Sequence, residues 1–312
     1  MISSIFGKTK PINYIILLTF LFFFYWFVHV VVFNKGYSVQ ELGLQLLVFA
    51  VLSGSMFLVD HIVLKNKLTD ANSFAILFFT ILMVVFPEAL LDNNAIFCGL
   101  FLLLAMRRLI TVRSLKDIKL KIFDATFWVV VASLFYDWAL LYLIIIFAAI
   151  YIYEPKNIRN WAVPFAGVFA VFMVTYGVLI LSGHTNFLAE HYTFAINFDV
   201  LYFANVTNSS KLVLYVLAIL ALTIFAFLKL GKAGLGKIVT MRLIALFFIV
   251  GLVVKVLSKA DTAYPISITF FPAVVFLSNY VESIKKEKLQ EILLIACIIV
   301  PLLVLLMGTM VG

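Results

Sequence analysis

A series of long, uninterrupted apolar runs limits what this 312-residue chain can fold into. A helix needs about 20 apolar residues to cross the roughly 30 Å hydrocarbon core of a bilayer. Because the runs do not alternate between apolar and polar residues, they favour helices over the strands of a membrane barrel. We identify eleven candidate spans, which are 11–33, 42–64, 73–91, 94–112, 122–136, 138–153, 161–182, 212–230, 241–258, 264–281 and 291–308. The sequence predicts an all-α, polytopic transmembrane helical bundle in one integral membrane domain, residues 1–312.

The composition excludes a soluble enzyme, a disordered chain and a disulfide scaffold. Hydrophobic residues make up 65% of the chain and charged residues 12%, against about half and about a quarter in a typical soluble domain. So few charged side chains cannot cover a globule of this size in water. We expect the first run to remain as a span, because its apolar core is long and no small-residue cleavage site follows it.

The basic residues are distributed unevenly between alternate loops. With the N-terminus in the cytoplasm, all but four of the 23 Lys and Arg residues fall on the inner side. Short cytoplasmic loops carry such an excess in membrane proteins. The distribution therefore predicts a cytoplasmic N-terminus and, with eleven spans, an outer C-terminus. It also accounts for the net charge of +8 without a nucleic-acid partner.

The densest cluster of positive charge directly follows the fourth run. We define this basic patch as Arg107, Arg108, Arg113, Lys116, Lys119 and Lys121. Its simplest role is to fix orientation and to hold anionic head groups, with each cation contributing about 1 kcal/mol near a charged leaflet. Docking of a cytoplasmic partner or of a polyprenyl phosphate is the alternative.

The pair of runs at 122–153 is too short for two full crossings. Two helices of about 15 residues each reach only about 22 Å at 1.5 Å per residue. The turn around Asp137 should then stop below the outer surface, either in a thinned bilayer or in a re-entrant hairpin buried in protein, which would leave nine full spans. Asp137 is either a general base or ion ligand in an outer vestibule, or a turn residue that reaches interfacial water.

Other ionisable residues lie near the predicted outer ends of the runs. Pro87 can end the third helix and turn Glu88 toward the vestibule, so Glu88 is the second candidate catalytic carboxylate. Glu41 fits a capping role at the start of the second run.

The remaining candidates are for substrate or lipid-phosphate binding. Lys255, Lys259 and Asp261 cluster after the ninth run, where Lys255 either snorkels along lipid or neutralises a phosphate. The largest outer loop, 183–211, contains His184 and His191 and has the mixed pattern of an interfacial helix. The other two histidines fall at opposite faces of the membrane, so the sequence predicts no metal centre and indicates no cofactor.

Three segments carry a resemblance to a known family. The opening MISSIFGKTKPINY, the block SLKDIKLKIFDATFWVVVASLFYDW and the late FFPAVVFLSNY resemble an uncharacterised family of bacterial polytopic inner-membrane proteins of about 300 residues. The hydropathy layout also loosely resembles GT-C polyprenyl-phosphate-dependent glycosyltransferases. That class keeps a catalytic carboxylate in its first outer loop, where this chain offers only Glu41.

Three functions remain open at this stage. The first is an enzyme of cell-envelope biogenesis that transfers a glycosyl group from or to a lipid-linked substrate. The second is a non-catalytic subunit or scaffold of an export or assembly complex, and the third is a transporter. The expected partners are membrane lipid and either a polyprenyl-phosphate-linked substrate or other envelope membrane proteins. The resemblance implies the bacterial inner membrane.

Overall fold

Helices form all the regular structure in the described part of the chain. A computed structural model describes residues 2–194, 206–229, 234–258 and 264–311. Eight of its helices are long and apolar enough to cross a membrane, which supports a multi-pass membrane protein. These eight are α2 (Pro11–Phe27) with its π-helical end η1 (Val28–Val32), α3 (Val39–Lys65), α5 (Asn93–Thr111), α8 (Ile158–Ser182), α11 (Val206–Lys229), α12 (Leu235–Leu257), α13 (Phe270–Ser283) with the preceding 3-10 turn η6 (Pro265–Thr269), and α14 (Glu287–Val311).

Shorter apolar helices occupy the remaining three predicted runs. They are α4 (Phe74–Val85), α6 (Ile118–Ser133) and α7 (Leu143–Tyr153), with the 3-10 turns η2 (Pro87–Leu90), η3 (Val112–Ser114) and η4 (Asp137–Tyr142) next to them. The N-terminal α1 (Ile2–Phe6) and α9 (Phe187–His191) have five residues each. Every predicted run therefore coincides with a helix. The number of full crossings and the sides of the two termini stay predictions.

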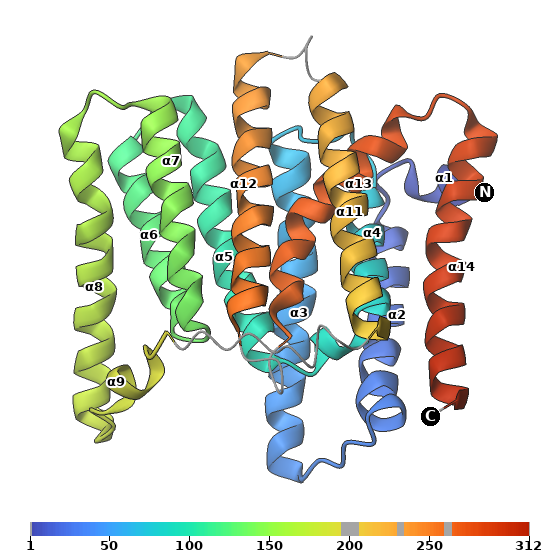
Figure 1. Ribbon diagram of the computed structural model, residues 1–312, viewed down its shortest axis with the longest axis horizontal. Coiled ribbons are helices and arrows are strands. Elements are labelled where there is room, and N and C mark those ends of the chain that lie inside the picture. Colours follow the sequence, from blue (N-terminus) through green and yellow to red (C-terminus); the bar gives the residue numbers. More distant parts are fainter. Residues whose placement is uncertain (1, 195–205, 230–233, 259–263, 312) are drawn as a thin grey trace.

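The bundle has two different ends. The basic end carries the loops 66–73, 115–117, 154–157 and 284–286, and it is at the top of Figure 1. At the opposite end, α2, α3 and α8 extend further down the view than α5, α7, α12 and α13 (Figure 1). We call this the recessed end. Helix length explains part of the difference, because α3 with 27 residues reaches about 40 Å and α4 with 12 residues about 18 Å. α12 has 23 residues and ends higher because it also begins higher in the view (Figure 1).

Local sequence determines where these helices begin and end. Ser38 and Glu41 form a reciprocal capping box at the start of α3, so Glu41 has the expected capping role. Pro87 follows the end of α4 and begins η2, as its missing N–H and fixed φ require. The turn between α6 and η4 stops above the lower ends of α3 and α8 (Figure 1), which agrees with the short lengths of α6 and α7.

The core lies around α4, α5 and α13. Nearly every residue of α4 is buried, and α13 buries three Phe side chains at positions 270, 271 and 276. Stacked rings of Phe101 and Trp128 join α5 to α6, with 5.6 Å between centroids.

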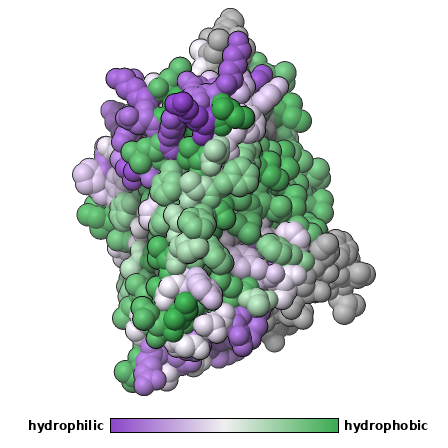
Figure 2. Space-filling view, turned by 90° about the vertical axis from the view of Figure 1, so that its left-hand side faces the viewer, coloured by the Kyte–Doolittle hydropathy of each residue, from purple (hydrophilic) through white to green (hydrophobic). Residues whose placement is uncertain are grey.

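The outer helices present apolar side chains to their surroundings. α8 exposes Phe165, Phe169, Phe172 and Val174. Figure 2 shows this side as a broad hydrophobic surface between hydrophilic ends. Such a belt is the surface expected of helices in contact with lipid.

Candidate functional site

Polar side chains from several segments gather at the recessed end, and in this polar layer Asp92 connects three of the segments. Asp92 is the N-cap of α5 and accepts a hydrogen bond from the Ala95 N–H at 2.9 Å. Its other oxygen accepts hydrogen bonds from the Tyr136 hydroxyl and, at 2.6 Å, from the Tyr264 N–H. The carboxylate is almost fully buried. It therefore ties α5 to the α6–η4 turn and to the segment before η6.

Glu88 forms an ion pair with Lys211 of α11. The Lys211 Nζ atom lies 3.0 and 3.1 Å from the two carboxylate oxygens. The Lys211 ammonium also lies 4.9 Å from the centre of the Phe86 ring, within cation–π range. Both charged side chains are partly exposed, at 22% for Glu88 and 32% for Lys211. The ion pair is thus held between η2 and α11 and remains partly accessible to solvent.

Asp137 begins η4 and accepts two backbone hydrogen bonds. The donors are the N–H of Trp138 at 2.8 Å and the N–H of Phe194 at 3.2 Å. The Phe194 ring packs edge-on against Trp138, with 5.4 Å between centroids. Asp137 therefore fastens the segment after α9 to the hairpin turn. A carboxylate with about four acceptor sites keeps capacity for a further donor.

The two histidines of the outer loop contact different parts of the protein. His191 of α9 contacts the Ser133 carbonyl oxygen through Nε2 at 2.7 Å. His184 is exposed, and its Nδ1 contacts the Ser182 carbonyl oxygen at the end of α8. Burial raises the pKa of the neighbouring Tyr192, and Asp137 raises it further, while a hydrogen bond with Ser133 opposes them. The loop thus contributes His191 and Tyr192 to the polar layer, and not His184.

Lys255 lies inside the bundle and not along its lipid-facing surface. Its side chain is 5% exposed, and its Nζ atom lies 5.8 Å from the centre of the Tyr264 ring. This burial does not agree with snorkelling along lipid, one of the two roles open for Lys255, and phosphate binding by Lys255 stays a prediction. Lys259 and Asp261 fall outside the described residues, as does most of the predicted interfacial segment of the outer loop. Within the described ranges, no group of three or more His, Cys, Asp and Glu side chains could hold a metal ion.

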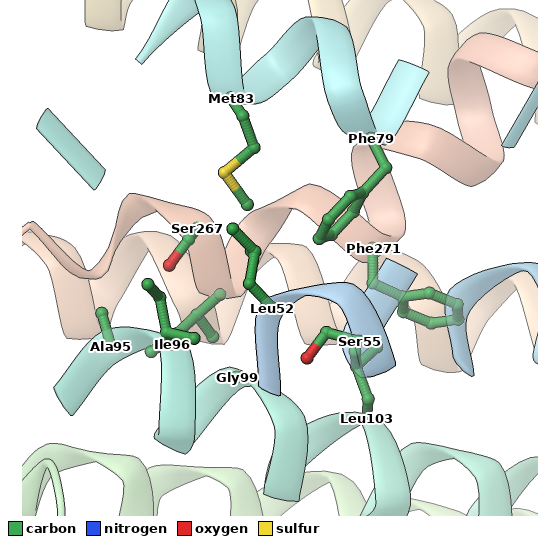
Figure 3. Close-up of a pocket in the computed structure, with 11 residues that line it drawn as sticks. Leu52, Ser55, Phe79, Met83, Ala95, Ile96, Gly99, Leu103, Ser267 and Phe271 are labelled. Carbon is green, nitrogen blue, oxygen red and sulfur yellow. The ribbon is translucent and has the colours of Figure 1, made fainter. Parts of the chain in front are cut away.

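A small cavity of about 20 Å³ lies between α3, α4, α5 and η6, next to the polar layer. Figure 3 shows Leu52, Phe79 and Met83 converging on it opposite Ile96. Its lining is apolar apart from the hydroxyl groups of two serines. The cavity is therefore part of the packed interior.

The basic patch divides into anchored and exposed cations. Arg108 forms an ion pair with Asp124 at 3.0 Å, and Lys121 donates to Thr111 and Ser114. Lys116 and Lys119 are exposed at the basic end. The patch lies at the basic end of the bundle, whereas the candidate carboxylates lie at the recessed end.

Several residues of the polar layer were not selected from the sequence as site residues. They include Asp92, Tyr136, Tyr192 and Lys211. The one local signal was the position of Asp92 directly before an apolar run, which is typical of an N-cap. Nothing local connects Glu88 with Lys211, because 123 positions separate them.

An apolar helical bundle with ionised groups gathered at its ends defines a multi-pass membrane protein. The chain belongs to a family of unknown function (DUF6427), whose profile matches residues 6–311. No curated protein and no solved structure matches the chain. The expected resemblance to an uncharacterised family is thereby confirmed, while bacterial origin and the likeness to GT-C enzymes stay predictions.

Proposed function

We propose that the protein is an envelope-biogenesis enzyme of the bacterial inner membrane that transfers a glycosyl group from or to a lipid-linked substrate at the recessed end. In this proposal the basic end faces the cytoplasm, as the distribution of Lys and Arg favours. The observation that carries the proposal is that Glu88, Lys211, Asp137 and Lys255 all lie at the recessed end. A lipid-linked substrate has its polar head close to the membrane surface, and in this proposal the head meets these groups at the recessed end while its chain stays in lipid.

The ion pair of Glu88 and Lys211 supplies both chemical roles that the transfer needs. A phosphate in the recess would compete with Glu88 for the Lys211 ammonium and would be stabilised as the leaving group. Glu88, released from its partner, would then accept the proton of an acceptor hydroxyl. Asp137 is the alternative base. Asp92 already receives three hydrogen bonds, so we assign it a positioning role.

Single substitutions that remove only charge test this assignment. Glu88→Gln and Asp137→Asn keep the side-chain shape, and Glu190→Gln on the exposed face of α9 is the matched control. We expect lipid extracts of cells carrying Glu88→Gln to accumulate an unmodified polyprenyl-linked precursor, with inserted protein at the level of the unsubstituted chain. If both substituted proteins restore the lipid profile of a deletion strain as well as the control does, the catalytic assignment is wrong.

A scaffold is the second candidate, and the exposed apolar faces of α8 and α14 favour it. α14 exposes Ile292, Val304 and Met307 among others, and a neighbouring membrane protein could cover these positions. Purification from native membranes in mild detergent distinguishes the two. A stoichiometric partner that is retained equally by the unsubstituted chain and by a Glu88→Gln, Asp137→Asn double variant, together with a normal lipid profile, would favour the scaffold.

A further inference from the structure

A second cavity, unrelated to the recessed end, lies at the basic end between α11, α12 and α13. Its volume of about 250 Å³ is several times the roughly 30 Å³ that one water occupies. Phe225 and Lys229 of α11, Lys237 and Met241 of α12, Glu282 of α13 and Asp70 of the loop before α4 are among the residues that line it. The cavity is open to the surface at the ends of these helices, and its charged lining makes it a candidate ligand site.

The cavity carries charges of both signs on different walls. Glu282 is fixed by the loop before α4, because its oxygens accept hydrogen bonds from the Asp70 N–H at 3.1 and 3.2 Å and from the Asn72 side-chain amide at 2.6 Å. The two lysines come from the facing ends of α11 and α12. Three helices and a loop thus bring these groups together.

This charge arrangement fits a ligand that is itself a zwitterion. Two ammonium groups suit a phosphate, whereas a carboxylate that still has acceptor capacity suits the N–H groups of a primary ammonium. Phe225 and Met241 add an apolar wall. The helix ends place the cavity where α11 and α13 would leave the hydrocarbon, which is the level of lipid head groups.

We propose that this cavity binds a phosphoethanolamine group, with the phosphate toward Lys229 and Lys237 and the ammonium toward Glu282. Phosphatidylethanolamine of the adjacent leaflet and a soluble phosphoethanolamine compound share this chemistry. A choline head group has no N–H group that could donate a hydrogen bond to Glu282. A phosphatidylglycerol head group has no ammonium group.

Native mass spectrometry of the detergent-purified full chain tests the proposal. Short-chain phosphatidylethanolamine, phosphatidylcholine and phosphatidylglycerol are added in parallel, and soluble phosphoethanolamine is added in a fourth arm. We expect phosphatidylethanolamine to be retained best. Retention of the soluble compound at the same concentration would assign a free metabolite as the source, and retention of the lipid alone would assign the membrane.

Two variants locate the binding. Lys229→Ala with Lys237→Ala should weaken retention of phosphatidylethanolamine by about tenfold or more, whereas Lys8→Ala with Lys10→Ala, the same change of charge at exposed positions of the basic end, should leave it unchanged. Glu282→Gln should remove the preference for ethanolamine over choline. Three outcomes would overturn the proposal: equal retention of all three lipids, a preference for phosphatidylglycerol, or equal loss of retention in both double variants. If Glu282→Gln fails to fold, the comparison of the three lipids on the unsubstituted chain still tests the proposal.

Discussion

At the scale of single residues, Asp92 holds the recessed end together. It is a buried carboxylate that accepts hydrogen bonds from Ala95, Tyr136 and Tyr264. A hydrogen bond to a charged group contributes more than a neutral one, and removing one partner leaves buried donors unsatisfied. Asp92 therefore acts on the candidate site through the elements that it joins.

Replacing Asp92 with Ala should lower the free energy of unfolding by about 2–3 kcal/mol, because the N-cap and two further hydrogen bonds are lost together. Cys98 is fully buried, so a thiol-reactive dye reports its exposure as the protein unfolds. We expect Asp92→Ala to lower the midpoint of this thermal transition by about 5 °C. The exposed Glu190→Ala should leave it in place, and an unchanged midpoint for Asp92→Ala would contradict the role described here.

At the scale of elements, close backbone approach holds α8 against α6. A Cβ atom at Gly167 would lie 2.8 Å from the Thr126 Cβ atom and 2.9 Å from its Cγ2 atom, closer than carbon atoms pack. Gly177 lies on the same helix, and a Cβ atom there would meet nothing within 4 Å. α8 is otherwise exposed along much of its length, so its attachment depends on this contact.

The two glycines provide a matched pair of substitutions. Gly167→Ala should destabilise the protein by about 1–3 kcal/mol, because the extra methyl group overpacks the α6–α8 interface. Gly177→Ala should be neutral or stabilising by up to about 1 kcal/mol, because alanine has the higher helix propensity. Cross-linking between cysteines placed on α6 and α8 would report the loss of contact, and similar behaviour of the two variants would show that the interface is not tightly packed.

A comparison of the helices with the sequence shows which features of the fold and of the candidate site the sequence alone predicts. Apolar runs predict all eleven helical segments, and Pro87 and Glu41 act locally as expected. Hydropathy could not show that Lys255 turns inward, because lipid and protein interior are both apolar. It could not join Glu88 to Lys211 either, since that contact depends on how distant helices pack.

At the scale of the whole molecule, the orientation of the bundle can be measured directly. In a background with Cys98→Ala and Cys297→Ser, single cysteines at Thr185 and at Lys116 mark the recessed and the basic end. We expect a membrane-impermeant maleimide added to intact spheroplasts to label Thr185→Cys at once and Lys116→Cys only after the membrane is permeabilised, because basic loops remain in the cytoplasm. The reverse pattern would invert the topology and place the candidate carboxylates inside the cell.

The unequal helix lengths also have an electrical consequence. Where water enters the recess, the low-dielectric barrier between the two aqueous phases is thinner than around α3, so the membrane voltage falls over a shorter distance. Moving one elementary charge across the full barrier at 100 mV takes about 2.3 kcal/mol. In the proposed orientation, an anion that reaches Glu88 and Lys211 from the outer phase would cross part of this barrier, and its occupancy would change with the membrane voltage.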